Sequence, residues 1–299
     1  LHSGTDLANQ LLKEYTFCCI PMLNPDGATL YTRANANSVD LNRDSKDLTQ
    51  PESKLLRATF EQFKPDFCFN LHDQRTIFGV AKSDKPATMS FLAPSYNEER
   101  EVNTTRLKAI NVIAGINKVL QDLIPGQVGR FDDSFNINCI GDMFQSLGVP
   151  TILFEAGHFQ NDYDREETRK YVFVSLVSAF ITINENDIVS NRIEDYLNIS
   201  QNNPVFCDFL YKNIKINYDG KEKIINFAAQ YKEELIDGQI CFNAYINQIE
   251  DLENRFGHLE YDAQGALYTD DYDNIPKLDQ KANFYLNNTT EFVNGLIKN

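Results

Sequence analysis

The stretch that decides the fold is PESKLLRATFEQF at residues 51–63, followed after two residues by DFCFNL at 66–71. The first part begins with Pro and Glu and repeats apolar residues at close to a 3.6-residue period, which predicts a helix. The second part is a short apolar run, which predicts a buried strand. A helix that leads directly into a buried strand is typical of α/β proteins, whose strands are mostly parallel.

The same alternation extends to both sides of this stretch. Apolar runs predict further buried strands over 17–23 and 149–154, and longer periodic segments predict helices over 103–123 and 166–183. The first part of the chain is therefore expected to form an α/β domain with a mixed, mostly parallel sheet flanked by helices.

The pattern changes after about residue 184. Alternating apolar and polar residues and two Asp-Gly pairs, at 219–220 and 237–238, predict β-hairpins. The expected elements are strands at 211–218, 224–231, 239–246 and 281–286 and a short helix at 291–297. We therefore predict two domains, an α/β domain over 1–187 and a smaller, acidic, β-rich accessory domain over 188–299.

Composition limits the classes of partner. The chain has 299 residues, with 28 basic and 43 acidic side chains and a net charge of −15, which disfavours binding to nucleic acid and to anionic membrane surfaces. Its longest apolar stretch, 171–183, is shorter than the ~20 residues that span a membrane. The six cysteines contain no Cys-x-x-Cys pair, and free thiols in apolar runs suit a reducing compartment, which predicts a cytoplasmic protein.

Four polar stretches lie at or near the ends of predicted elements, where open α/β sheets place their sites. They are NPDG at 24–27, RANANSVDLNR at 33–43, NLHD at 70–73 and FEAG at 154–157. A Glu at the end of a buried strand costs several kcal/mol unless something compensates its charge. Each stretch alone also has a structural interpretation: a turn, a surface ion pair or a capped His.

Taken in order and at these spacings, the motifs resemble those of the zinc carboxypeptidases of the carboxypeptidase A type. The resemblance covers roughly residues 15–180. It implies a carboxypeptidase-like fold and a zinc-dependent hydrolase, a metallocarboxypeptidase that cleaves the C-terminal peptide bond of peptides.

The resemblance also implies roles for single residues. His72 matches a zinc ligand, and Glu155 matches the general base that takes a proton from zinc-bound water. Arg33 matches the arginine that stabilises the developing oxyanion. Asp40 falls where the family keeps a carboxylate that orients a ligand histidine. These types suit amide hydrolysis, because zinc lowers the pKa of its water and an arginine stabilises negative charge.

Two further residues match the family's grip on the substrate. Asn42 and Arg43 correspond to the pair that holds the terminal carboxylate, for which the guanidinium fork is suited. A residue near 140–142 would set side-chain specificity, although Asp142 can equally cap a helix.

The sequence departs from the family pattern in three ways. No His-x-x-Glu motif supplies the other two zinc ligands, so we expect the domain to lack its N-terminal part, with those ligands upstream of Leu1, and this chain to bind zinc poorly and to be inactive by itself. Ser38 stands where the family usually has Gly, and no Tyr occurs in FDDSFN at 131–136, near where the family's substrate-covering tyrosine would lie.

Two other functions remain open on the sequence. An amino-acid deacylase of the aspartoacylase and succinylglutamate desuccinylase type shares the zinc site, Asp-Leu-Asn-Arg and a trailing β domain, and its substrate would be an N-acyl amino acid rather than a peptide. A zinc-free peptide-binding relative is expected if the encoded protein also lacks His-x-x-Glu.

Overall fold

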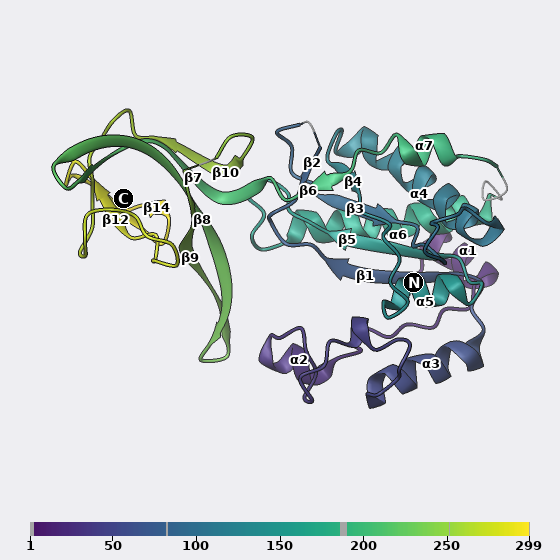
Figure 1. Ribbon diagram of the computed structural model, residues 1–299. Coiled ribbons are helices and arrows are strands. Elements are labelled where there is room, and N and C mark those ends of the chain that lie inside the picture. The colour runs from purple at the N-terminus through teal and green to yellow at the C-terminus, as the bar shows by residue number, and fades with distance from the viewer. Residues whose placement is uncertain (1–2, 82, 186–189, 251, 299) are drawn as a thin grey trace. The chain divides into compact units, whose positions relative to one another are not determined.

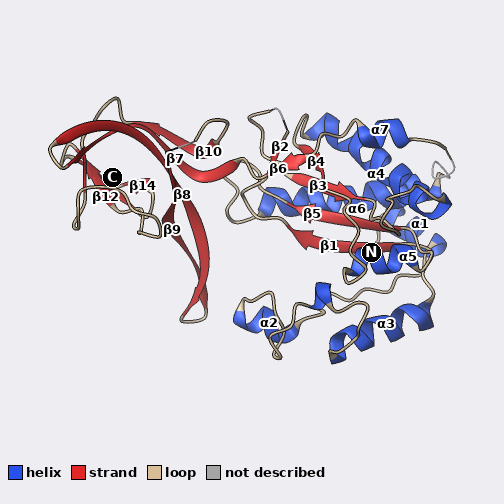
Figure 2. Ribbon diagram, viewed as in Figure 1, coloured by secondary structure: helices blue, strands red, loops and turns tan. Residues whose placement is uncertain are grey.

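The computed structural model describes residues 3–81, 83–185, 190–250 and 252–298. The chain forms two compact units, each built from three segments. Unit 1 comprises Leu1–Asp73, Thr88–Ala156 and Glu166–Gln201, and unit 2 comprises Gln74–Ala87, Gly157–Arg165 and Asn202–Asn299. Unit 1 is mixed α/β and unit 2 is β-rich, which confirms the predicted fold class (Figure 2).

Unit 1 contains a four-stranded mixed sheet in the order β1-β5-β3-β4 (Figure 1). The strands are β1 (Cys68–Asp73), β3 (Met89–Leu92), β4 (Val128–Arg130) and β5 (Thr151–Ala156). β1 pairs with β5 and β3 with β4 in parallel, whereas β3 and β5 are antiparallel. The sheet is therefore mostly parallel, as predicted, but β3 and β4 were not predicted because each has only three or four residues.

Helices α4 and α6 cover one face of this sheet, and the predicted helices agree closely with them. The helices of unit 1 are α1 (Asp6–Glu14), α2 (Pro25–Leu30), the 3-10 helix η1 (Leu41–Arg43), α3 (Pro51–Phe63), α4 (Thr104–Leu123), α5 (Ile140–Ser146), α6 (Glu166–Asn184) and α7 (Ile193–Leu197). The Asn103 side chain caps α4, and Gly115 lets α4 approach Thr182 of α6 closely. Ile152 and Phe154 of β5 are buried on this face.

The strand predicted over 17–23 is wrong, because these residues form no strand and Cys18 and Cys19 are exposed. Phe17 packs edge-on against Phe180 of α6, with 5.2 Å between the ring centroids. A strand needs a neighbouring strand to pair its backbone groups, and among the described residues β1 is the edge of the sheet without a partner on that side. Apolar character alone therefore did not decide the burial of this segment.

Unit 2 is built around a four-stranded sheet in the order β10-β7-β8-β9. Its strands are β7 (Phe206–Tyr218), β8 (Lys221–Ile236), β9 (Gln239–Ile249) and β10 (Phe256–Asp262). The two Asp-Gly pairs join β7 to β8 and β8 to β9, and all four of their residues have φ between 50° and 76°, as hairpin turns of this kind require. The sequence therefore predicted both hairpins correctly.

The C-terminal segment forms a second small sheet rather than a helix. Its strands are β11 (Tyr268–Thr269), β12 (Phe284–Leu286), β13 (Thr290–Val293) and β14 (Leu296–Ile297), while β2 (Gly79–Val80) pairs with β6 (Asn202–Asn203) elsewhere in unit 2. Asn294 and Gly295 both have positive φ and turn β13 into β14, which explains why the predicted helix over 291–297 is wrong. Phe284 and Phe292 stack at 4.5 Å in the core of unit 2.

A fully buried carboxylate, that of Asp208, lies inside unit 2. It accepts hydrogen bonds from the Tyr163 hydroxyl and the Tyr231 backbone N–H, both at 2.7 Å, and from the side-chain amide of Gln230. Burial raises the pKa of this carboxyl, and the hydrogen bonds act in the opposite sense. Asp208 thus joins the short segment around Tyr163 to the long strands β7 and β8.

The rings of two histidines of unit 2 pack against each other near this carboxylate, with an angle of 52° between their planes. The rings of His158 and His258 are 4.2 Å apart, and His258 Nε2 lies 2.8 Å from the carbonyl oxygen of Thr76, to which it donates. Burial lowers the pKa of both rings, that of His158 to about 3. All three segments of unit 2 therefore meet in one buried polar cluster.

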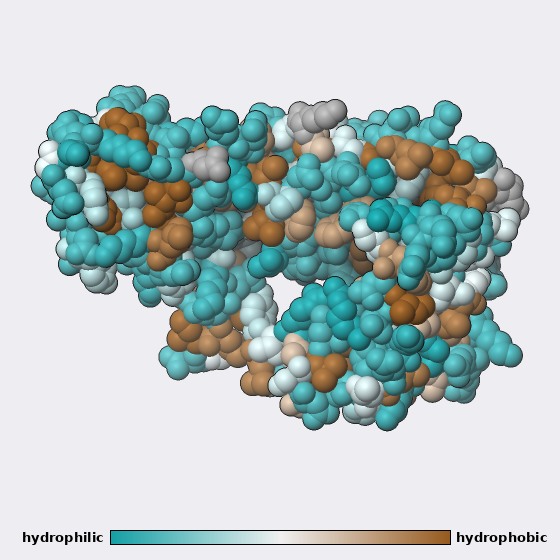
Figure 3. All heavy atoms as spheres, viewed as in Figure 1, coloured by the Kyte–Doolittle hydropathy of each residue, from teal (hydrophilic) through white to brown (hydrophobic). Residues whose placement is uncertain are grey.

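A compact group of exposed apolar side chains lies on the surface of unit 2. Leu235, Ile236 and Ile240 are 39–46% exposed at the tip of the β8–β9 hairpin, which is brown in Figure 3. The predicted domain boundary at 187/188 lies outside the described residues, so the division into 1–187 and 188–299 stays a prediction. None of the described helices is both long and apolar enough to cross a membrane.

Candidate functional site

The sheet of unit 1 places His72 and Glu155 side by side. They are register partners at the carboxyl ends of the parallel strands β1 and β5, so their side chains leave the same face of the sheet. Ser90 of β3 is the register partner of Glu155 on its other side. This face is opposite the one that α4 and α6 cover, since neighbouring residues along a strand point to opposite faces.

Helix α5 lies on the His72 and Glu155 face. It contacts β1 and β5, and a Cβ placed on its Gly141 would lie 3.8 Å from Nδ2 of Asn70, two residues before His72. The loop between η1 and α3 packs against the same helix, because the Ser45 N–H donates to the carbonyl oxygen of Asn138 at 3.2 Å. The predicted site segments therefore converge on α5.

Arg33, Asp40 and Asn42 form a connected group. Arg33 Nε donates to Asp40 Oδ2 at 2.7 Å, and the other oxygen of Asp40 accepts the Asn42 backbone N–H at 2.9 Å, which starts η1. In the structure the hydrogen bonds of Asp40 hold Arg33 and the first turn of η1, and its expected role in orienting a ligand histidine stays a prediction. Ser38 has a φ of 61°, a left-handed conformation that explains why Gly suits this position.

Asn42 and Arg43 are held against the start of α5. Asn42 Oδ1 accepts the Ile140 backbone N–H at 2.8 Å. Arg43 Nη1 donates to the Asn42 carbonyl oxygen at 2.6 Å and lies 3.2 Å from the sulfur of Cys139. In the part of the chain that the structure describes, Asn42 Nδ2 and both Nε and Nη2 of Arg43 make no hydrogen bond, so these donors are available to a ligand.

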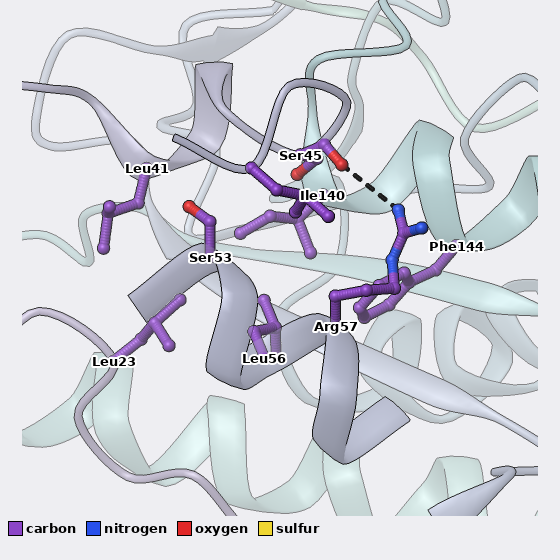
Figure 4. A pocket seen from close by; sticks show the side chains of 9 residues that line it. Leu23, Leu41, Ser45, Ser53, Leu56, Arg57, Ile140 and Phe144 are labelled. Carbon is purple, nitrogen blue, oxygen red and sulfur yellow. Dashed lines mark hydrogen bonds between the residues drawn. The ribbon is translucent and has the colours of Figure 1, made fainter. Parts of the chain in front are cut away.

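A small apolar cavity lies beside η1, the short helix that carries Asn42 and Arg43. Leu41, the first residue of η1, lines this cavity together with Ile140 of α5 and Leu56 of α3 (Figure 4). Arg57 donates to the Ser45 carbonyl oxygen at 3.1 Å. The cavity has a volume of about 10 Å³, which is room for one water molecule. It is too small to hold a substrate.

Two buried acids lie on this side of unit 1, Glu155 of β5 and Asp142 of α5, and burial raises the pKa of each to about 7. The Glu155 side chain is 8% exposed, and within the described residues its Oε2 has no hydrogen-bond partner. Burial raises the pKa of Glu155 to about 7, Asp73 adds to this rise, and the positive charge of Arg33 opposes it. A carboxyl with such a pKa can exchange protons near neutral pH.

The His72 ring is influenced by the same charged groups. Burial lowers its pKa first, Arg33 and Arg43 lower it further, and Asp40 acts in the opposite direction. His72 is therefore a neutral imidazole at neutral pH, which is the form that ligates metals.

The described residues do not fit a catalytic zinc site. Such a site takes three protein ligands and an open position. Among the described ranges 3–81, 83–185, 190–250 and 252–298, no three His, Cys, Asp or Glu side chains gather so that they could hold a metal ion. His72 thus stands without companion ligands from these ranges.

The structure brings together the six residues to which the sequence gave roles and adds the contacts of three others, of which Ile140 and Asp73 lie in stretches that the sequence had singled out. The three are Cys139, Ile140 and Asp73. The first two meet the Asn42–Arg43 pair across 96 and 98 positions of sequence, so no local signal could have found these contacts. Asp73 directly follows His72, and its effect on Glu155 could have been expected from the parallel pairing of their strands.

Comparison with known proteins finds a distant similarity to carboxypeptidases. No protein-family model matches the chain. Carboxypeptidase SOL1 of Arabidopsis thaliana is 29% identical to it over 116 residues, which cover 31% of this chain. The chain is a distant relative of the carboxypeptidases. This finding confirms the resemblance inferred from the motifs; the match spans 23% of that protein's length.

Solved structures give a partial likeness to the same group. Metallo-carboxypeptidases from Burkholderia cenocepacia and Pseudomonas aeruginosa and a putative carboxypeptidase A from Shewanella denitrificans match with TM-scores of 0.46, 0.39 and 0.41 and identities of 16%, 14% and 15%. They cover 61%, 56% and 55% of this chain, which spans 49%, 45% and 45% of theirs. The Pseudomonas protein was solved with (2-guanidinoethylmercapto)succinic acid.

Proposed function

We propose that this protein acts on peptides as a carboxypeptidase does, by taking hold of the free C-terminal carboxylate. The observation that carries the proposal is the set of unused hydrogen-bond donors on Asn42 and Arg43, two neighbouring residues of η1. Asn42 Nδ2 and the Nε and Nη2 of Arg43 are left unused by the described residues, while Ile140 and Cys139 fix the other polar atoms of the pair. A planar guanidinium edge beside an amide N–H matches the two oxygens of a carboxylate.

Glu155 is proposed as the group that moves the proton. Its pKa of about 7 means that it accepts a proton and returns it at little cost near neutral pH. Arg33, held by Asp40, provides positive charge on the Glu155 side of the site and is proposed to stabilise negative charge that develops on the substrate.

Hydrolysis through zinc would need two ligands besides His72, and the described residues do not supply them. This favours a second candidate for the chain itself, namely peptide binding without turnover. In both candidate functions Asn42 and Arg43 bind the peptide's terminal carboxylate. The two differ only in whether the terminal residue is released by hydrolysis.

The test compares an N-acetylated pentapeptide that has a free C-terminal carboxylate with the same peptide as its amide. We expect calorimetry to give a dissociation constant about 10- to 100-fold lower for the acid, since a charged bidentate contact contributes about 1.5–3 kcal/mol. Arg43→Ala should abolish this preference. Arg169→Ala, which removes an exposed arginine of α6 that pairs with Glu166, serves as the matched control and should leave the preference unchanged.

Equal binding of the acid and the amide by the unaltered chain would contradict the proposal. Mass spectrometry of the incubated peptide then separates the two candidates, because release of the C-terminal residue identifies a hydrolase and an intact bound peptide identifies a binding protein. N-acetyl amino acids, assayed in parallel, test the deacylase alternative, which requires their hydrolysis while peptides stay intact.

A further inference from the structure

Contacts at the N-terminal end of α5 hold the side chains of Asn42 and Arg43. The Ile140 N–H binds the Asn42 side-chain oxygen, which leaves the amide nitrogen as the end of that side chain able to face a ligand. One residue earlier, the Cys139 sulfur lies 3.2 Å from Arg43 Nη1. The two neighbouring residues of α5 therefore each fix one member of the pair.

We infer that Cys139 is a positioning residue for Arg43: its sulfur and the Asn42 carbonyl oxygen engage Nη1 and so present Nε and Nη2 of the guanidinium to a peptide's terminal carboxylate. This inference rests on the proposed function. It adds to the family pattern a side chain that touches no substrate and acts only through the arginine.

Three features of Cys139 support this role. It occupies the N-cap position of α5 but makes no side-chain capping hydrogen bond. Its sulfur therefore contacts Arg43 without competition from the helix backbone. It is half-buried, and burial raises the pKa of its thiol, with Arg43 opposing the rise. The thiol is thus protonated at neutral pH and meets the arginine as a weak neutral acceptor.

The energetic reason lies in the length of the arginine side chain. Arg43 is exposed, and a free arginine loses considerable rotamer entropy when a ligand fixes it. Contacts that hold Nη1 in advance reduce this loss, so they improve affinity without touching the ligand. A negatively charged partner for Nη1 would compete with the substrate carboxylate, whereas a neutral sulfur does not.

The experiment measures the ratio of the dissociation constants for the amide and acid forms of the N-acetylated pentapeptide. We expect Cys139→Ala to lower this ratio about three-fold, as loss of one weak hydrogen bond implies. Cys139→Ser keeps an acceptor and should restore most of the ratio. Cys18→Ala removes an exposed thiol of unit 1 as the matched control and should change nothing.

The ratio separates positioning from general structural damage, because a destabilised chain binds both peptides less well and leaves their ratio unchanged. In an Arg43→Ala background, Cys139→Ala should have no further effect on the ratio. Should Cys139→Ala fail to fold, Cys139→Val keeps the volume without the acceptor and is expected to lower the ratio equally.

Two results would overturn the inference. If Arg43→Ala abolishes the preference for the acid while both Cys139→Ala and Cys139→Val retain it in full, Cys139 does not position Arg43, although the proposed function stands. If the unaltered chain shows no preference, the proposed function and this inference both fail.

Discussion

Glu155 of unit 1 and Asp208 of unit 2 are both buried carboxylates, and their hydrogen-bonding surroundings are opposite. Asp208 in unit 2 accepts hydrogen bonds from Tyr163, Gln230 and Tyr231. Glu155 in unit 1 is almost as buried, but its Oε2 meets no donor among the described residues. Burial raises the pKa of both carboxyls, yet only that of Asp208 is opposed by several hydrogen bonds.

This difference separates an acid with a structural role from the one for which we propose a role in proton transfer. A buried carboxylate with its donors in place joins the segments around it and contributes to stability. A buried carboxylate without them costs stability, and proteins tolerate that cost mainly where a perturbed acid has chemistry to do. The comparison therefore predicts stability changes of opposite sign at the two positions.

The largest effect is expected in unit 2. Asp208→Ala removes the acceptor of three hydrogen bonds inside unit 2, although Gln230 Nε2 keeps a second acceptor in Thr76 Oγ1. The variant should lower the free energy of unfolding by about 4 kcal/mol. Since the chain has no Trp, circular dichroism during urea unfolding and hydrogen exchange of the β8 amides are the suitable measurements. Asp208→Asn keeps one acceptor oxygen and should cost less. A loss below about 1 kcal/mol for the alanine variant would remove the distinction between the two acids.

Glu155→Gln is expected to stabilise the protein. The folded pKa of about 7 lies above the ordinary value of 4.5, so Glu155 costs nothing below pH 4.5 and an increasing amount as the pH rises to 7. At pH 4 the variant and the unaltered protein should have the same free energy of unfolding, and at pH 8 that of the variant should be about 3 kcal/mol higher. Unfolding midpoints across this range test it, and a variant less stable at pH 8 would show that Glu155 is satisfied after all.

The smallest effect concerns His158. Its contribution to stability decreases as the pH falls, which is the opposite of the pH dependence expected for Glu155. Burial, followed by the charge of His258, lowers its pKa from 6.5 to about 3, so the unfolded chain gains a proton first as the pH falls. Stability should therefore decrease below pH 6.5, by about 0.7 kcal/mol between pH 7 and pH 6. In His158→Gln this contribution is absent, so the difference in free energy of unfolding between the variant and the unaltered protein should become smaller from pH 7 to pH 6. A difference that stays constant over this interval would contradict the lowered pKa of His158.

The parts of the fold that could be predicted are those with strong local signals. The helix predicted over 51–63 has the same first and last residue as α3 in the structure, because Pro marks its start and periodic apolar residues continue to its last turn. The β7–β8–β9 hairpins followed from Asp-Gly pairs in alternating sequence. The Asn294-Gly295 turn carried a similar signal, and the apolar residues around it were assigned to a helix in error.

What could not be predicted depended on distant partners. Residues 17–23 have the composition of a strand, but a strand forms only beside another strand. In the site, motif order identified Arg33, Asn42, Arg43 and their companions, whereas the contacts of Cys139 and Ile140 arise from packing between η1 and α5. Motif order identified the groups suited to the chemistry, and only the packing shows how those on η1 are held.

The segmented build of unit 2 has a consequence for how such a protein can arise or be engineered. Its buried cluster draws on Gln74–Ala87, Gly157–Arg165 and Asn202–Asn299, so no single position along the chain separates it from unit 1. A gene fusion at one junction, such as 187/188, would transfer the long strands without Thr76 and Tyr163. Unit 2 therefore cannot behave as a portable cassette, and transplanting it requires all three segments to be moved together.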